Sequence, residues 1–295
     1  MYHRKHFHLN EYLRERHGEK VIKLSLDGGF SCPNRDGTLS YGGCIFCNSH
    51  GSGDFAGDRR LDIQSQINSQ ISLLQNKWPR VKKYIAYFGA YSNTYAPLSV
   101  LQQKYETALA VENVVGLAIA TRPDCLPIPT LEYLHLLNDT THLWVELGLQ
   151  TIHSNSATWI NRGFSLEQFN IAVSELHKRN IEIVVHIIVG LPNESIHDII
   201  ETAKYLSQLP ITGIKIHMLH ILKNSPLAKQ YNDNPFYIFT EEEYINIVSE
   251  ILNVLPPNII IHRLTGDGAK ENLIAPLWTL NKKRVLNNLH KSLNF

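Results

Sequence analysis

Three of the four cysteines stand close together near the start of the sequence. Eleven residues separate Cys32 from Cys44, and two more separate Cys44 from Cys47. Thiolates at this spacing can bind one metal centre, and the pair Gly42-Gly43 lets the backbone fold back tightly just before Cys44. Four cysteines in 295 residues are too few for a disulfide framework. This group of three cysteines is therefore where we first expect chemistry.

The spacing leaves three interpretations open. Three thiolates could bind three irons of a [4Fe–4S] cluster and leave the fourth iron open to a small ligand. His50, with two residues between it and Cys47, could instead complete a Cys3His zinc site. The cysteines could also be ordinary packed thiols, which is what we expect of Cys125, since it has no metal-ligand spacing to the others.

The sequence around these cysteines resembles a known cluster loop. The segment LSLDGGFSCPNRDG…GGCIFC is similar to the loop of radical S-adenosylmethionine (SAM) enzymes, with a longer gap between the first two cysteines than the three residues common there. The longer gap, with FGAYSNTYAP, ATRPDCL, ELGLQT, GLPNES and HRLTGD in the same order, resembles a small bacterial family related to the catalytic subunit of the elongator complex. The resemblance covers nearly the whole chain.

The resemblance implies the cofactors and several residues that hold them. It implies a [4Fe–4S] cluster on Cys32, Cys44 and Cys47, SAM at the open iron, and a 5′-deoxyadenosyl radical that takes a hydrogen atom from the substrate. Where many relatives hold the SAM amino group with Gly-Gly-Glu, this chain has GAY and no carboxylate, so we expect backbone carbonyls or nearby polar side chains to replace it. The cofactor residues that we expect are Phe46, Gly89, Ser92, Glu146, Gln150, Arg162, Ile187 and Gly190.

Further polar residues follow the expected strands. Glu146 and Gln150 alternate along one strand and so share a face, and burying them is costly unless a partner or ligand satisfies them. The residues that we expect to meet substrate are Asn93, Tyr95, Arg122, Asp124, Lys215, His217, His262, Arg263 and Asp267. For Arg122 and Asp124 a salt bridge at the rim is the alternative, and we expect His186 to be a satisfied core histidine.

Apolar runs and helical patterns alternate over most of the chain. The expected strands are 21–26, 83–88, 115–120, 143–149, 181–189 and 213–219, with a further candidate at 259–262, and the expected helices are 62–77, 98–110, 130–137, 165–178, 195–206, 240–255 and 281–293. Such alternation predicts a parallel sheet, either doubly wound or an incomplete (β/α) barrel. No GxGxxG follows the first strand, which disfavours a dinucleotide-binding fold.

The resemblance implies the barrel among these folds. We expect an α/β fold with a partial (β/α)6 radical SAM barrel, extended at both ends of the chain. Its expected parts are an N-terminal extension (1–20), the core barrel (21–235) and a C-terminal extension that packs on it (236–295). In a barrel the chemistry lies at the carboxyl ends of the strands, so the loops after the strands should carry the site.

Composition and charge exclude few partners. Hydrophobic residues make up 43% of the chain and charged residues 19%, which is a globular composition. No apolar run is long enough to span a membrane, and no secretory signal follows the N-terminus, so we expect a cytoplasmic protein. The net charge is +1, but both ends of the chain are rich in lysine and arginine. If the ends meet, they form a basic patch.

For substrate, the resemblance and the basic ends suggest tRNA. The sharpest hypothesis is remodelling of the C5 substituent of the wobble uridine, from carboxymethylaminomethyl toward aminomethyl. A reducing protein such as flavodoxin or ferredoxin would supply the electron. One alternative is radical chemistry on a small metabolite or a porphyrinogen-like compound, and another is a zinc-stabilised RNA-binding module without catalysis.

Overall fold

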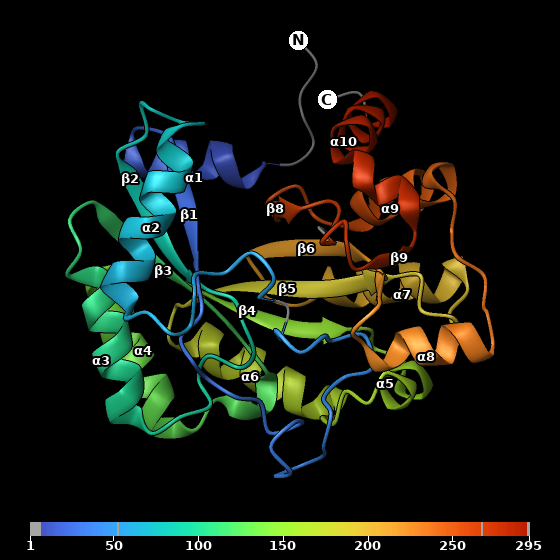
Figure 1. Ribbon diagram of the computed structural model, residues 1–295, viewed down its shortest axis with the longest axis horizontal. Helices are drawn as coiled ribbons and strands as arrows, with labels where there is room; N and C mark the ends of the chain where they lie inside the picture. The colour runs from blue at the N-terminus through green and yellow to red at the C-terminus, as the bar shows by residue number, and fades with distance from the viewer. Residues whose placement is uncertain (1–6, 52, 267, 294–295) are drawn as a thin grey trace.

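A single curved sheet organises the computed structural model, which describes residues 7–51, 53–266 and 268–293. Within these residues seven parallel strands pair in the order β1-β2-β3-β4-β5-β6-β8. They are β1 (Val21–Leu26), β2 (Lys83–Phe88), β3 (Val114–Thr121), β4 (His142–Gln150), β5 (Glu182–Val189), β6 (Gly213–Met218) and β8 (Ile260–Arg263) (Figure 1). Each strand lies next to its neighbour in the sequence, whereas a doubly wound sheet would reverse its order at one point. The sheet is a half-barrel, as the sequence predicted.

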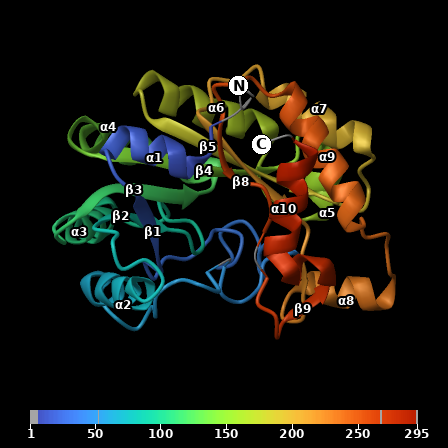
Figure 2. The same cartoon turned by 90° about the horizontal axis from the view of Figure 1, so that it is seen from above.

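Helices cover the convex side of the half-barrel (Figure 2). They are α2 (Ile63–Gln75), α3 (Leu98–Leu109), α4 (Ile128–Thr140), α6 (Leu166–Lys178), α7 (Ile196–Leu206) and α9 (Glu241–Val254). Ser165 and Thr240 begin α6 and α9 with capping boxes, as predicted from the residues three positions later. Helix α4 is longer than predicted, because Pro129 falls in its first turn, where the missing amide hydrogen costs nothing.

Several short elements were not predicted from the sequence. They are α1 (Leu9–His17), α5 (Ser154–Trp159), α8 (Pro226–Asp233), the antiparallel pair β7 (Ile221–Leu222) and β9 (Leu273–Ala275), and the 3₁₀ turns η1 (Pro123–Cys125) and η2 (Leu277–Asn281). Leu9 and Leu13 of helix α1 pack against Val21 and Trp144, so the helix closes the amino end of the half-barrel.

The two faces of the sheet differ in chemistry. Outward side chains such as Leu24 and Val145 belong to the large core under the helices and are fully buried. Inward side chains at the amino ends of the strands, such as Ile85 and Val184, form a second, smaller core with α1. Nearer the carboxyl ends the inward side chains become polar and partly accessible. The polar residues are therefore placed where the loops after the strands gather.

The end of the chain completes the sheet. Strand β8 comes from the segment expected as a C-terminal extension, yet it pairs with β6 and adds a seventh strand to the six of the expected core. Helix α10 (Lys282–Ser292) packs on α9. The rings of His8 and His290 lie 5.7 Å apart, so the two terminal segments meet. Among the described helices, none combines the length and the apolarity needed to cross a membrane.

Candidate metal and cofactor site

The long connection between β1 and α2 carries the three clustered cysteines and runs across the middle of the molecule in Figure 2. Cys32, Cys44 and Cys47 are half-buried and form no disulfide. Burial, together with the neighbouring Cys47 and Cys32, raises the pKa of Cys44 to about 12. The three sulfurs therefore lie close enough to repel one another when ionised, which is the situation that a bound cation relieves.

The loop is fixed by a segment far along the sequence. The Asn161 side chain donates to the carbonyl of Gly43 at 2.9 Å, and the amide of Ile45 donates to the carbonyl of Ile160 at 3.0 Å. In return Asn34, which is fully buried, donates to the carbonyl of Asn161 and lies 3.7 Å from the Cys44 sulfur. Gly42 and Gly43 both have positive φ, of 84° and 83°, as the tight fold of the loop requires.

The spacing of the sulfurs favours an iron–sulfur cluster over zinc. Sulfurs on one tetrahedral zinc ion, each about 2.3 Å from the metal, stand roughly 4 Å apart. Within the described residues, one group of three possible metal ligands has its ligand atoms within 4.8 Å of each other, and it consists of His153, Asp198 and Glu201. The three cysteine sulfurs do not all lie that close together. His50 is exposed and faces Asp54 at 3.3 Å. The described residues therefore show no Cys3His group close enough to hold one zinc ion, and the zinc interpretation is not supported.

Two arginines flank the cysteines. Arg122 forms a two-pronged pair with Asp124, with distances of 2.9 and 2.7 Å, and also donates to the carbonyl of Arg162. The expected pair at the rim is therefore a buried salt bridge. Arg162 donates through Nε and Nη1 to three carbonyls, among them those of Leu149 and Thr151, and its Nη2 donates to none of the described residues. That nitrogen is the part of Arg162 that a SAM carboxylate could use.

Buried acceptors without partners surround the same region. Ser92 Oγ, Asn93 Oδ1 and Gln150 Oε1 are buried and accept no hydrogen bond from the described residues. The amide of Ser92 donates to the carbonyl of Ser31, next to the first cysteine, at 3.2 Å. The Gln150 side chain lies over Gly148. A Cβ added at Gly148 would lie only 2.8 Å from Gln150 Nε2, so a side chain there would push the Gln150 amide aside. Orphaned acceptors at the carboxyl edge of the sheet fit a ligand with several donors, such as the SAM amino group.

The remaining expected cofactor residues divide between the two faces. Phe46 packs half-buried beside the small core around Ile160. Ile187 points outward into the core under the helices, so only its backbone can line the cofactor side, and Ile188 is the side chain on the inner face. Gly190 has φ of 98°, and Gly89 lies against the Tyr87 ring. Their roles toward SAM stay predictions.

Glu146, which was expected beside the cofactor, instead lies with the expected substrate residues Lys215 and His217 inside the half-barrel. Glu146 is fully buried and contacts Lys215 directly, and His186 Nε2 lies 2.9 Å from its other side. Burial alone would raise the pKa of Glu146, but the lysines and His186 hold it well below its usual value. The His217 ring lies 5.3 Å from that of His186. His262 and Arg263 come from β8, and Asp267 lies outside the described residues.

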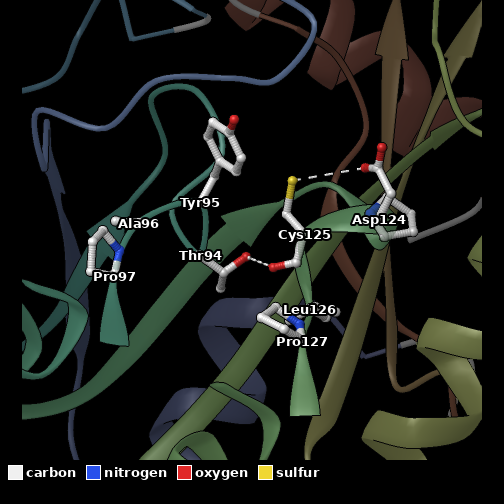
Figure 3. Close-up of a pocket in the computed structure, with 9 residues that line it drawn as sticks. Thr94, Tyr95, Ala96, Pro97, Asp124, Cys125, Leu126 and Pro127 are labelled. Carbon is white, nitrogen blue, oxygen red and sulfur yellow. Dashed lines mark hydrogen bonds between the residues drawn. The ribbon is translucent and has the colours of Figure 1, made fainter. Parts of the chain in front are cut away.

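A pocket of about 600 Å³ opens between the loops after β2 and β3. Figure 3 shows Tyr95 and Cys125 facing one another across it, with Asp124 beside the Cys125 sulfur. Tyr95 also meets the cluster loop, because its hydroxyl lies 2.8 Å from that of Thr38. Cys125 is buried, as expected of a packed thiol, and burial raises its pKa to about 12.

Some polar residues of the site were not found from the sequence. Lys23 lies inside an apolar strand, and Asn34 and Asn161 act on each other across 127 positions, so no local pattern marks them. Glu194 is a buried carboxyl group whose pKa burial raises. The signal that the sequence did offer was Lys23, a lysine within a mostly apolar strand.

Known proteins resemble the chain over nearly its full length. The Radical SAM superfamily model matches residues 32–206, and the Radical_SAM C-terminal domain model matches residues 211–294. The chain is 48% identical to YtqA of Bacillus subtilis, over 98% of this chain and 90% of that protein. It is 38% identical to YhcC of Escherichia coli, over 96% and 90%.

Two more distant matches come from Methanocaldococcus infernus. A tRNA uridine(34) acetyltransferase of Methanocaldococcus infernus is 24% identical over 54% of this chain and 30% of its own length. The solved structure of the Elp3 protein of the same organism superposes with a TM-score of 0.69 at 17% identity, over 92% of this chain and 63% of that one. At that identity the superposition shows a shared fold.

Proposed function

The chain belongs to the radical SAM superfamily, and we propose that it remodels the C5 substituent of the wobble uridine in tRNA, converting carboxymethylaminomethyl toward aminomethyl. The family implies a [4Fe–4S] cluster and SAM, and the donor set of Cys32, Cys44 and Cys47 fits the cluster. Bound together and reduced, these cofactors supply a 5′-deoxyadenosyl radical.

The observation that carries the tRNA proposal is the sequence match to a protein named for uridine 34 of tRNA. The tRNA uridine(34) acetyltransferase matches about half of this chain in sequence, and the Elp3 structure matches nearly all of it in fold. A wobble base lies in a single-stranded loop, where it can leave the stack and enter a protein site. The contact between the terminal segments supports a basic surface, since the exposed Lys283, His290 and Lys291 of α10 lie near the end that carries α1.

The substrate offers one carbon that suits this chemistry. The methylene between the amine nitrogen and the carboxylate has weak C–H bonds, because the nitrogen and the carboxylate both stabilise a radical there. When bound, the cofactors would supply the radical that removes one hydrogen atom from this carbon, as 5′-deoxyadenosine. Return of a second electron to the oxidised cluster would leave an imine, and water would then release the two-carbon unit as glyoxylate and leave the aminomethyl group. The protein's task is to hold the methylene against the cofactor and to exclude water.

The test is turnover of isolated tRNA. Anaerobically loaded protein, SAM and dithionite are incubated with tRNA from a strain that lacks this gene, and the nucleosides are measured by mass spectrometry. We expect 5-carboxymethylaminomethyluridine to fall and 5-aminomethyluridine to rise, with 5′-deoxyadenosine formed. Cys44→Ala should abolish all three changes, and Cys125→Ala is the matched cysteine control that should retain them. SAM cleavage without any change in tRNA would contradict the proposal.

A further inference from the structure

A layer of charged side chains spans the inside of the half-barrel below the cofactor loops. We call it the lumen floor and define it as Lys23 (β1), Tyr87 (β2), Glu146 (β4), His186 (β5) and Lys215 (β6). Its members touch. Lys215 contacts Glu146 and lies 3.3 Å from the Tyr87 hydroxyl, and both ammonium groups lie over the Tyr87 ring, at 4.6 and 4.5 Å from its centre. The floor is a built ionic site rather than a scatter of polar residues.

The floor holds two ammonium groups and one carboxylate. Glu146 accepts three hydrogen bonds, since one oxygen accepts from Trp144 Nε1 at 2.9 Å and the other accepts from Lys215 and His186. Lys23 forms a longer ion pair with Glu146, at 3.7 Å from the nearer oxygen. Its side chain is 21% exposed, whereas that of Glu146 is 0% exposed. An ammonium group so placed has unused donors and favours a second anion.

Space above the floor lets a ligand reach it. The next inward positions toward the carboxyl ends of β2, β3 and β4 are Gly89, Ala120 and Gly148, which carry almost no side chain. Inward side chains at this level, such as Ile188 and His217, are partly exposed, while outward neighbours are fully buried. Several inward positions from this level down to Lys23 therefore keep part of their surface exposed.

A second polar group points to the same ligand. His217 lies one inward position above Lys215, and its Nε2 is buried without a partner among the described residues. A neutral imidazole can donate a hydrogen bond through that nitrogen to an anionic oxygen. His217 thus adds a donor beside His186, on the same inner face of the sheet as Lys23.

We propose that the lumen floor binds the carboxylate of the substrate's C5 substituent, with Lys23 as the ammonium group that pairs with it. This assignment rests on the proposed function and names the part of the substrate that is recognised. Anchoring the carboxylate fixes the adjacent methylene, which carries the hydrogen atom that is removed. The aminomethyl product ends in a cation, so two ammonium groups repel it. The floor therefore separates substrate from product by charge.

The test is equilibrium binding, measured without turnover. Three probes, 5-carboxymethylaminomethyluridine, 5-aminomethyluridine and uridine 5′-monophosphate, are titrated into wild-type protein and into Lys23→Met and Lys23→Arg. A charge-assisted contact should make wild type bind the carboxylate probe about ten- to a hundred-fold more tightly than the amine probe. Lys23→Met should reduce that preference to about two-fold, and Lys23→Arg should keep most of it. Lys83→Met is the matched control, because Lys83 lies at the amino end of β2 beside Glu19 and should leave the preference unchanged.

Three results would overturn the assignment. They are no preference or no binding in wild type, an unchanged preference in Lys23→Met protein that melts like wild type, or tight Lys23-dependent binding of uridine 5′-monophosphate, which would make the floor a phosphate site. The tRNA assay above is independent of these. A Lys23-dependent preference without tRNA conversion would refute the proposed function alone, and conversion with an unchanged preference in Lys23→Met would refute the floor alone.

Discussion

Replacing Lys215 by methionine should destabilise the protein far more than replacing both members of its ion pair. Lys215 and Glu146 have side chains that are 3% and 0% exposed, so the single substitution leaves a carboxylate deep in the protein without its closest cation. Breaking a buried pair in this way costs about 3–5 kcal/mol. Lys23 at 3.7 Å and the His186 hydrogen bond still offset part of the charge, which places the expected loss near 3 kcal/mol.

The double variant Glu146→Gln/Lys215→Met removes both charges and keeps the shape. A glutamine can still accept from Trp144 through its oxygen and donate to His186 through its NH2 group, so we expect the free energy of unfolding of the double variant to lie within about 1 kcal/mol of the wild-type value. The coupling between the two substitutions should then be at least about 2 kcal/mol.

Urea unfolding followed by circular dichroism measures wild type, Lys215→Met, Glu146→Gln and the double variant, and thermal melts should shift by roughly 2–4 °C per kcal/mol. If the double variant lost as much free energy as the two single variants added together, the ion pair would contribute no coupling. The interpretation of the lumen floor as a compensated ionic layer would then be refuted.

Three further predictions follow from the site. Burial and Lys215 lower the pKa of His186 to about 4 although Glu146 raises it, so stability present above pH 6.5 should be lost as the pH falls from 6.5 to about 4. The expected loss in the free energy of unfolding is up to roughly 3 kcal/mol. In His186→Gln the plot of unfolding free energy against pH should be flatter over this range. An unchanged slope would contradict the burial of a neutral imidazole. Asn161→Gly removes the side-chain hydrogen bond to the Gly43 carbonyl, and glycine tolerates the positive φ of 53° at this position. A chelator should then remove bound iron faster than from wild type, because the loop loses a contact worth about 1–2 kcal/mol. Equal rates of iron loss would show that Asn161 does not hold the loop. Binding of tRNA should weaken with added salt, and the double variant Lys283→Ala/Lys291→Ala should lower the slope of log K against log salt by up to about 2; a salt-independent affinity would favour a small-molecule substrate.

The sheet could be predicted from the sequence because its strands are buried on both faces. Strands of that kind read as short apolar runs, and all seven expected runs became strands within a few residues of their predicted ends. Helix α1 gave no such signal. It has nine residues, most of them polar, and His8 rather than Ser or Thr begins it. Its position depends on Leu9 and Leu13 finding the open end of the half-barrel, which is a tertiary contact.

The site was predictable where local spacing carries the chemistry. The cysteines and the Gly42-Gly43 turn were found because a metal centre constrains neighbours in the sequence. Lys23 and His186 could not be assigned, because a strand pattern does not say which face becomes the concave one. Both residues act through Glu146, which lies 40 positions from His186 in the sequence, although its carboxylate oxygen lies 2.9 Å from His186 Nε2.

The measurement that tests the central claim most directly is the metal content and SAM chemistry of anaerobically purified protein. Iron, sulfide and zinc are determined for wild type, Cys44→Ala and Cys125→Ala, and 5′-deoxyadenosine is measured after reduction with dithionite. The account predicts about four irons per chain and 5′-deoxyadenosine formation, both lost in Cys44→Ala and both kept in Cys125→Ala. One zinc, no iron and no SAM cleavage in wild type would contradict it.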